Sequence, residues 1–512
     1  MKKIISRIAG MILSMMLVFT ICPALGADAE ENGFVIENGV VTGYTGAGGE
    51  ITIPTEAVSV ADYAFAGNGN ISSITVPAEV KSVGSYSFSG CTALTSVVFA
   101  GNTALGSGVF YGCSNLGYVQ LPSGLGSIGA QMFKDCSSLN GVEIPGSVTS
   151  IGDEAFGGCS SLSGISIPGS VTSIGGSAFY GCTSLGSIAI PDSVSSMGSG
   201  VLYGCSGLGS VSLPGGITSI PELTLYGCSS LSSIEIPSSV TSIGANAFGK
   251  CSGIAKLSIP AATSSIDFSA FEGCSNLLSI SVGSGNGAYA SYDGCVYNSG
   301  LSKLLYCPIG KSSISVADKV SSIGSGAFND CQYVSNLKVP EGVSTIEANA
   351  FSNSGIGSVT IPGSVTSIGD QSSWNPDVIY GYTGTYAEAF ANEKGYVFES
   401  LGNIGGSDDS DKSDEDDKEE DSDKKDDTGK PDNSGNTAGG SSNSGNESSQ
   451  NTSGGSAGGS GATITKTMND TKVKDATPKT GVAFDARYFL PISVFFVGLY
   501  LMVSKKKTSK AE

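Results

Sequence analysis

A repeat of about 23 residues constrains this chain more than any other feature of its sequence. One copy, CSSLSGISIPGSVTSIGGSAFYG at 159–181, is followed at once by a near-identical one. A proline column keeps the 23-residue spacing over 122–260, and about 14 copies lie within 53–361. A cysteine column is spaced by 22 residues once and by 23 seven times: Cys91, Cys113, Cys136, Cys159, Cys182, Cys205, Cys228, Cys251 and Cys274. The chain is therefore a repeat protein rather than a row of ordinary domains.

The shared pattern Cys-x-x-Leu-x-x-Ile-x-Ile-Pro-x-x-Val-x-x-Ile-Gly-x-x-Ala-Phe-x-x predicts one stacked turn per copy. The alternation in Ile-x-Ile indicates a short strand with one buried face, and proline ends it because proline has no N–H for the next ladder bond. Val-x-x-Ile-Gly indicates a second apolar corner turned by glycine, and Ala-Phe places a ring inside. We expect a repeat solenoid with a β-strand per repeat and little helix. At about 4.8 Å per turn it would be roughly 70 Å long.

The cysteine column has three interpretations. Equivalent positions of a solenoid stack in a row, where a small thiol packs well, so we favour buried structural thiols. Neighbouring copies also lie within disulfide range, although nine consecutive equivalents cannot all pair. A metal site needs ligands from several directions, and the chain has no histidine, so we expect no metal and no cofactor. Cys295 and Cys307 lie outside the column and flank an expected hairpin at 296–306; they are a candidate disulfide, with packing as the alternative.

The run Ile-Pro-x-x-Val-x-x-Ile-Gly-x-x-Ala-Phe-x-x-Cys and the stretch YASYDGCVYNSGLSKLLYCP resemble the leucine-rich repeats of the BspA-like class of bacterial surface proteins. The resemblance covers about 33–401. It implies a curved solenoid with a sheet along one side, a hairpin insertion near 286–310, and adhesion to host proteins, glycans or other bacteria. We expect an N-terminal cap and first repeat at 28–66, the repeat solenoid at 67–370 and a C-terminal cap at 371–401.

The C-terminal cap has its own sequence signals. Thr385 and Glu388 have the spacing of a capping box, which predicts a short helix that Gly395 closes. Trp374, the only tryptophan, precedes that helix. We interpret this tryptophan as a hydrophobic plug, with a ligand-binding end as the alternative.

Both ends of the chain suggest export. Lysines and an arginine precede an apolar run, which predicts a signal peptide at 1–27. Residues 402–476 are acidic and then rich in glycine, serine and asparagine, so we expect a disordered linker. A composition so poor in apolar residues cannot form a core.

Residues 477–512 resemble the cell-wall sorting signal of Gram-positive bacteria, with an apolar segment at 488–503 followed by lysines. Threonine stands where the usual motif has leucine. The resemblance implies that a sortase cleaves after Thr480 and joins the chain to peptidoglycan. The alternative is a C-terminal membrane anchor, and the apolar segment would meet the membrane in either case. The candidate recognition residues are Thr477, Pro478, Lys479, Thr480 and Gly481.

Composition removes several classes of function. A net charge of −20 leaves no basic field for nucleic acid. The absence of histidine removes Ser-His-Asp and Cys-His nucleophiles, and only seven scattered acidic residues lie within 113–260. We therefore expect a non-catalytic surface adhesin or interaction protein. The alternatives are a structural wall protein without a specific ligand and, less favoured, a surface hydrolase.

One tyrosine column is the candidate contact for an unknown extracellular protein or glycan. Tyr180, Tyr203 and Tyr226 are 23 residues apart and each stands two residues before a column cysteine; Tyr111 holds the same place earlier. Stacked copies would line these rings up as an aromatic stripe for a partner to contact. The alternative is edge packing between neighbouring copies.

Overall fold

The computed structural model describes residues 32–404. Within that range no helix has the length and apolar character needed to cross a membrane. The expected signal peptide at 1–27, the sorting signal with its apolar segment at 488–503, and all but the first residues of the expected linker lie outside the described residues.

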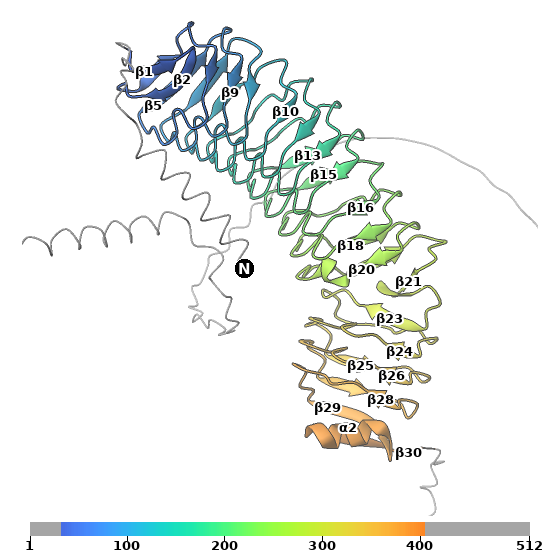
Figure 1. Cartoon of the computed structure of the whole chain (residues 1–512). Helices are drawn as coiled ribbons and strands as arrows, with labels where there is room; N and C mark the ends of the chain where they lie inside the picture. The colour runs from blue at the N-terminus through green and yellow to red at the C-terminus, as the bar shows by residue number, and fades with distance from the viewer. Residues whose placement is uncertain (1–31, 405–512) are drawn as a thin grey trace, which may run out of the picture. The chain divides into compact units, whose positions relative to one another are not determined.

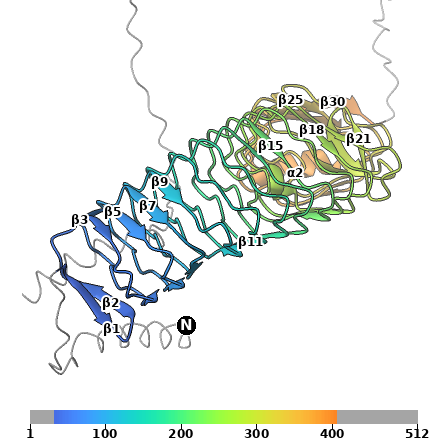
Figure 2. The same ribbon diagram turned by 90° about the horizontal axis from the view of Figure 1, so that it is seen from above.

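The described chain winds into a β-solenoid of about 16 turns with almost no helix, which confirms the expected fold class (Figures 1 and 2). Equivalent residues of successive turns pair in parallel register, for example Ser127 with Ser150 and Ser150 with Ser173. The 23-residue period is therefore the hydrogen-bonding register. Because each turn pairs with the next, every copy covers the apolar edge of its neighbour.

The Ile-x-Ile segments form the first sheet row, and the strands that precede a proline end one or two residues before it, as expected. The row runs through β3 (Gly49–Thr52), β5 (Ile71–Val76), β7 (Ser96–Phe99), β9 (Tyr118–Gln120), β13 (Ser187–Ala189), β15 (Ser210–Ser212), β18 (Lys256–Ile259), β20 (Ser279–Val282), β25 (Asn336–Lys338), β27 (Ser358–Thr360), β29 (Val378–Thr383) and β30 (Phe398–Asn403).

The Val-x-x-Ile-Gly segments form a second sheet row, which the sequence pattern had suggested was only a corner. Its strands are β2 (Val40–Tyr44), β4 (Ser59–Val60), β6 (Ser82–Val83), β8 (Ala104–Leu105), β10 (Ser127–Ile128), β11 (Ser150–Ile151), β12 (Ser173–Ile174), β14 (Ser196–Met197), β16 (Ser219–Ile220), β17 (Ser242–Ile243), β19 (Ser265–Ile266), β23 (Lys303–Tyr306), β24 (Ser322–Ile323), β26 (Thr345–Ile346) and β28 (Ser367–Ile368). At the front, β1 (Phe34–Glu37) pairs antiparallel with β2.

The glycine of the Val-x-x-Ile-Gly pattern has a different role from the one predicted, as Gly152 shows. A Cβ on Gly152 would lie 2.5 Å from the backbone nitrogen of Ala130 in the preceding turn, and Gly152 does not have a positive φ. The missing side chain therefore permits close approach of two turns. It does not supply a left-handed corner.

The third side of each turn carries the phenylalanine column, which fills the interior. Phe156 lies between Phe133 and Phe179, with ring centroids 5.3 and 5.4 Å away. Leu202 and Leu225 take the same place in two turns, and both are fully buried. Backbone hydrogen bonds continue along this side, since the Phe156 N–H donates to the Ala178 carbonyl at 2.8 Å.

The expected hairpin insertion is present and divides the core. Strand β21 (Tyr289–Tyr292) pairs antiparallel with β22 (Cys295–Asn298), which pairs antiparallel with β23. The 3-10 helix η1 (Phe268–Phe271) lies shortly before it. The buried apolar side chains form two connected groups that meet at this insertion, one beginning at Phe34 and the other ending at Ala391.

The C-terminal cap contains the predicted helix, α2 (Tyr386–Lys394), with Thr385 as N-cap and Gly395 in a left-handed conformation after it. The predicted capping box does not form. The Thr385 hydroxyl donates to the Tyr382 carbonyl, and the Glu388 carboxylate accepts from the Gly384 N–H instead of from Thr385. A β-strand and a glycine immediately before the helix supply these nearer partners.

Trp374 is buried inside this cap. Its ring centroid is 4.7 Å from that of Phe351, and its indole N–H donates to the Ile356 carbonyl at 2.9 Å. It thus continues the aromatic column at the end of the solenoid, as expected of a hydrophobic plug.

Candidate ligand-binding site

The structure places the column cysteines in one buried row. All nine are free thiols: Cys91, Cys113, Cys136, Cys159, Cys182, Cys205, Cys228, Cys251 and Cys274. Each donates a hydrogen bond of 3.0–3.3 Å to the carbonyl of the column phenylalanine or leucine one turn earlier. Cys331 extends the row, although the hairpin insertion shifts it out of the 23-residue count.

Burial makes this row of thiols unreactive. It raises the pKa of Cys91, Cys159 and Cys274 to about 12. The thiolate is the form that attacks electrophiles and binds metals, so the row supplies neither chemistry near neutral pH. Over residues 32–404, no group of three or more cysteine, aspartate or glutamate side chains is arranged to hold a metal ion.

Three of the four predicted tyrosines form a stripe on the outside of the solenoid. The Tyr203 ring centroid is 5.6 Å from that of Tyr180 and 5.0 Å from that of Tyr226, with the latter pair nearly parallel. The Lys250 ammonium lies 5.2 Å from the Tyr226 ring centroid. Since much of the inner ring faces is taken up by these contacts, the stripe offers a partner mainly ring edges and phenol hydroxyls.

Tyr111 belongs to a second aromatic group, apart from the stripe. It packs edge-to-face against Tyr86, with Lys134 above its ring, and Tyr86 stacks on Tyr63 at 5.5 Å. Tyr63 and Tyr86 precede their column phenylalanines by two residues, whereas Tyr111 follows its own. The tyrosine column defined from the sequence leaves out Tyr63 and Tyr86, because it includes only tyrosines that stand two residues before a column cysteine. The 23-residue spacing between Tyr63 and Tyr86 was the available signal.

Within the described residues the first sheet row is interrupted three times, and clefts lie at the interruptions after β9 and after β15. In an intact pair of turns, the Ile190 N–H donates to the Ser212 carbonyl at 3.0 Å. In the described part of the chain no backbone hydrogen bond joins β9 to residues 141–144. The Leu121 N–H and the Glu143 carbonyl, which correspond to the intact pair, have no backbone partner there. A cleft of about 730 Å³ lies between these turns.

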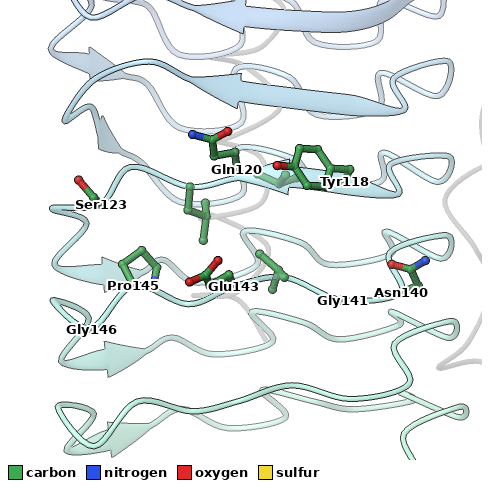
Figure 3. Close-up of a pocket in the computed structure, with 11 residues that line it drawn as sticks. Tyr118, Gln120, Ser123, Asn140, Gly141, Glu143, Pro145 and Gly146 are labelled. Carbon is green, nitrogen blue, oxygen red and sulfur yellow. The ribbon is translucent and has the colours of Figure 1, made fainter.

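Polar side chains line the mouth of this first cleft, and apolar ones form its floor (Figure 3). Tyr118 and Gln120 lie on β9, and Asn140 and Glu143 lie on the following turn. Tyr118 is 55% exposed, the largest side chain on this face of the turn. The floor consists of Val119, Leu121 and the partly buried Val142.

A second cleft of about 430 Å³ repeats the first after β15. Seven of its eight lining residues stand 92 residues, or four repeats, after lining residues of the first cleft: Val211, Ser212, Leu213, Gly215, Glu235, Pro237 and Ser238. Here too the ladder is absent, and the Leu213 N–H and Glu235 carbonyl have no backbone partner within the described range. The same local construction therefore occurs twice on one face.

Each cleft presents the same set of groups: an amide N–H, a carbonyl and a glutamate carboxylate above an apolar floor. These groups suit an extended polar chain, since they can pair with backbone amides or hydroxyls, and the carboxylate favours a cationic group. The sequence hinted at the pair through Glu143 and Glu235, which interrupt a row of small side chains at equivalent positions. The loss of the ladder itself has no sequence signal that we recognise.

The other predicted site residues fall elsewhere. Cys295 and Cys307 are buried free thiols whose sulfurs lie 2.6 Å apart. The residues of the expected sortase motif, 477–481, lie outside the described range.

Comparison with known proteins gives one family and several structures of the same kind. No curated protein matches the chain. A leucine-rich repeat protein from Bacteroides ovatus is 22% identical, with 75% of this chain and 99% of that chain covered and a TM-score of 0.43. A leucine rich cell surface protein from Faecalibacterium prausnitzii is 26% identical, with 48% and 90% covered and a TM-score of 0.28. The leucine rich repeat protein of T. pallidum is 26% identical, with 42% and 82% covered and a TM-score of 0.25.

The family model described as the BspA type leucine rich repeat region, in six copies, matches residues 45–163, 149–278, 197–308 and 302–375. These segments together span more than half of the sequence. The chain therefore belongs to the BspA type leucine rich repeat family.

Proposed function

We propose that this chain is a non-catalytic interaction protein of the bacterial surface, which binds an extended protein or glycan partner along its first sheet row. The observation that carries the proposal is the pair of equivalent clefts. Sites of the same construction, four turns apart on one face, suit a ligand that itself extends along the solenoid.

Several features support a binding role over catalysis. The buried thiols have raised pKa values, and the chain has no histidine to serve as a general base. The clefts instead combine backbone groups with an equivalent glutamate, Glu143 in the first and Glu235 in the second, which Asp192 accompanies. Such sites give affinity and orientation rather than acid–base chemistry.

The place of action in this proposal is the Gram-positive cell wall. The apolar N-terminal run supports export, and the Thr-Pro-Lys-Thr-Gly sequence at 477–481, followed by an apolar segment and lysines, supports transfer by a sortase to peptidoglycan. Replacing Thr480 with alanine should move the chain from the wall fraction to the membrane or the medium. A variant that stays covalently bound to peptidoglycan would contradict the anchoring.

The test of binding uses the whole chain against immobilised matrix proteins, mucin, polysaccharides and bacterial cells. The double variant E143Q/E235Q removes the carboxylate of the equivalent glutamate in each cleft with little change in shape. Glu222, exposed in a neighbouring part of the turns, gives the matched control E222Q. Saturable binding that weakens at least tenfold in the cleft variant and persists in the control supports the proposal.

A third variant, with Tyr180, Tyr203 and Tyr226 changed to serine, separates the two candidate surfaces. Binding lost in this variant alone assigns the site to the tyrosine stripe. A folded chain that binds none of these surfaces supports the alternative of a structural wall protein without a specific ligand.

A further inference from the structure

The hairpin insertion brings two cysteines together, Cys295 and Cys307, so that the thiol of one points to the sulfur of the other. Cys295 is the first residue of β22, and Cys307 directly follows β23, its antiparallel partner. Both side chains are fully buried, and their sulfurs are 2.6 Å apart. A disulfide bond would therefore require the sulfurs to approach by only about half an ångström.

The column cysteines provide an internal comparison. Their thiols point to backbone carbonyls at 3.0–3.3 Å, so each is already held by a polar partner of the preceding turn. Cys331, beyond the insertion, likewise points to the Cys307 carbonyl at 3.6 Å. The Cys307 thiol has no such carbonyl partner and points to the sulfur of Cys295.

The position of this pair in the stack explains why two small residues meet there. The Cys307 N–H donates to the Ala327 carbonyl, as the Phe328 N–H donates to the Ala350 carbonyl one turn later. Cys307 thus occupies the place of a column phenylalanine. The ring is replaced by two thiols, at the point where the two buried groups of the solenoid meet.

We propose that Cys295 and Cys307 are joined by a disulfide in the exported protein, while the column cysteines and Cys331 remain thiols. The bond fixes the hairpin across the seam between the two halves of the core. It rests on the proposed export, because exported proteins meet oxidising conditions that cytoplasmic ones do not.

The chemistry requires an oxidant of the thiol–disulfide class, such as the disulfide of an oxidoreductase or a small-molecule disulfide. One cysteine, as thiolate, attacks the oxidant and forms a mixed disulfide, releasing one oxidant sulfur as a thiol. The second cysteine then displaces the other oxidant sulfur. Two electrons and two protons pass to the oxidant, and the Cys295–Cys307 bond forms. Because both sulfurs are buried in the finished fold, this exchange takes place while the hairpin is forming.

The test is a map of the bonds in the full chain refolded from denaturant and reductant with reduced and oxidised glutathione. Free thiols are alkylated under denaturing conditions before digestion. Cleavage after Lys303 separates the two cysteines, so their peptides stay together only through the bond. We expect this linked pair, an alkylated Cys274 on the same peptide as Cys295, and alkylation at every other column cysteine.

The variants C295S and C307S each should abolish the linked pair and leave the remaining cysteine of the pair alkylated. As a matched control, C159S should leave the link unchanged. Alkylation of both Cys295 and Cys307 in the refolded wild-type chain would overturn the proposal, as would a link to a column cysteine. The wild-type map decides the matter even where a variant fails to fold.

Refolding in vitro needs no export. A chain that never reaches the surface therefore contradicts the proposed function, while the peptide map still decides the pairing.

For protein recovered from the surface, reductant should lower the thermal midpoint of wild type and leave that of C295S unchanged. An equal shift in both would count against a bond that fixes the seam.

Discussion

Replacing Phe156 with alanine tests how strongly the aromatic column holds neighbouring turns together. Phe156 is fully buried, with its ring almost parallel to those of Phe133 and Phe179, at 12° and 1°. Removing a buried phenylalanine ring costs about 3–5 kcal/mol. Each stacked pair contributes about 0.5–1.5 kcal/mol beyond area burial. We therefore expect F156A to lower the free energy of unfolding by about 4 kcal/mol, including both lost stacks.

The chain supplies its own control for this experiment. Leu202 and Leu225 occupy the same place in two other turns and are fully buried there. Phe156→Leu keeps most of the volume and loses both stacked pairs, so it should cost about 1–3 kcal/mol. Both variants lose the ring stacking, so the difference between their free energies of unfolding measures the cost of the cavity alone.

Two probes locate the effect during urea unfolding. Far-UV circular dichroism reports all turns, whereas the fluorescence of Trp374 reports the second buried group. Phe156 belongs to the first group, and a solenoid couples mainly nearest neighbours. F156A should move the circular dichroism midpoint more than the tryptophan midpoint. Equal losses for the alanine and leucine variants, or a loss below about 1 kcal/mol for F156A, would refute the reasoning.

Three further predictions concern the thiols, an ion pair and a left-handed turn. Because burial raises the pKa of Cys159 to about 12, the thiolate forms only far above pH 9, and a thiol reagent should label this residue in urea but not in the native protein at pH 9. Lys303 lowers the pKa of Glu347 through a hydrogen bond, so the unfolded chain binds the proton more readily and the pair stabilises the fold above about pH 4.5. K303M should thus lower the thermal midpoint at pH 7, by a free energy under about 1 kcal/mol, and this effect should diminish as the pH falls below about 4.5. Gly181 has φ +67 and room for a Cβ, so G181A should cost about 1 kcal/mol in a urea titration, and G181N, which copies Asn353 at the same place, should cost less.

The sequence predicts the stacking of the turns well because each rule acts within one copy and is then repeated. Alternation before proline gives the first sheet row, and the Ala-Phe pair gives the interior column. What it misses depends on contacts between copies. Position 152 needs glycine because the backbone of the preceding turn comes so close to it. The Thr385 hydroxyl donates to the nearby Tyr382 carbonyl and does not form the predicted capping box. The absent ladder at 141–144 depends on the distance between two backbones, which no single copy specifies.

The tyrosines show the same limit on what the sequence predicts. Their 23-residue spacing predicted that Tyr180, Tyr203 and Tyr226 lie side by side, and their ring centroids are 5.0–5.6 Å apart. The sequence did not indicate that the rings would contact one another so closely. Tyr111 shares their position in the copy but lies with Tyr86, because Lys134 and a glycine occupy the turns between.

The distance between the two clefts is set by counting turns. Four strand spacings of about 4.8 Å put them roughly 19 Å apart. Because the register is carried by equivalent residues, the gain or loss of one whole copy between them would lengthen or shorten that distance by about 4.8 Å and leave each cleft intact. The number of copies between the clefts thus sets the distance between them. Duplication of one 23-residue unit would by itself adapt the chain to a ligand whose binding groups are further apart.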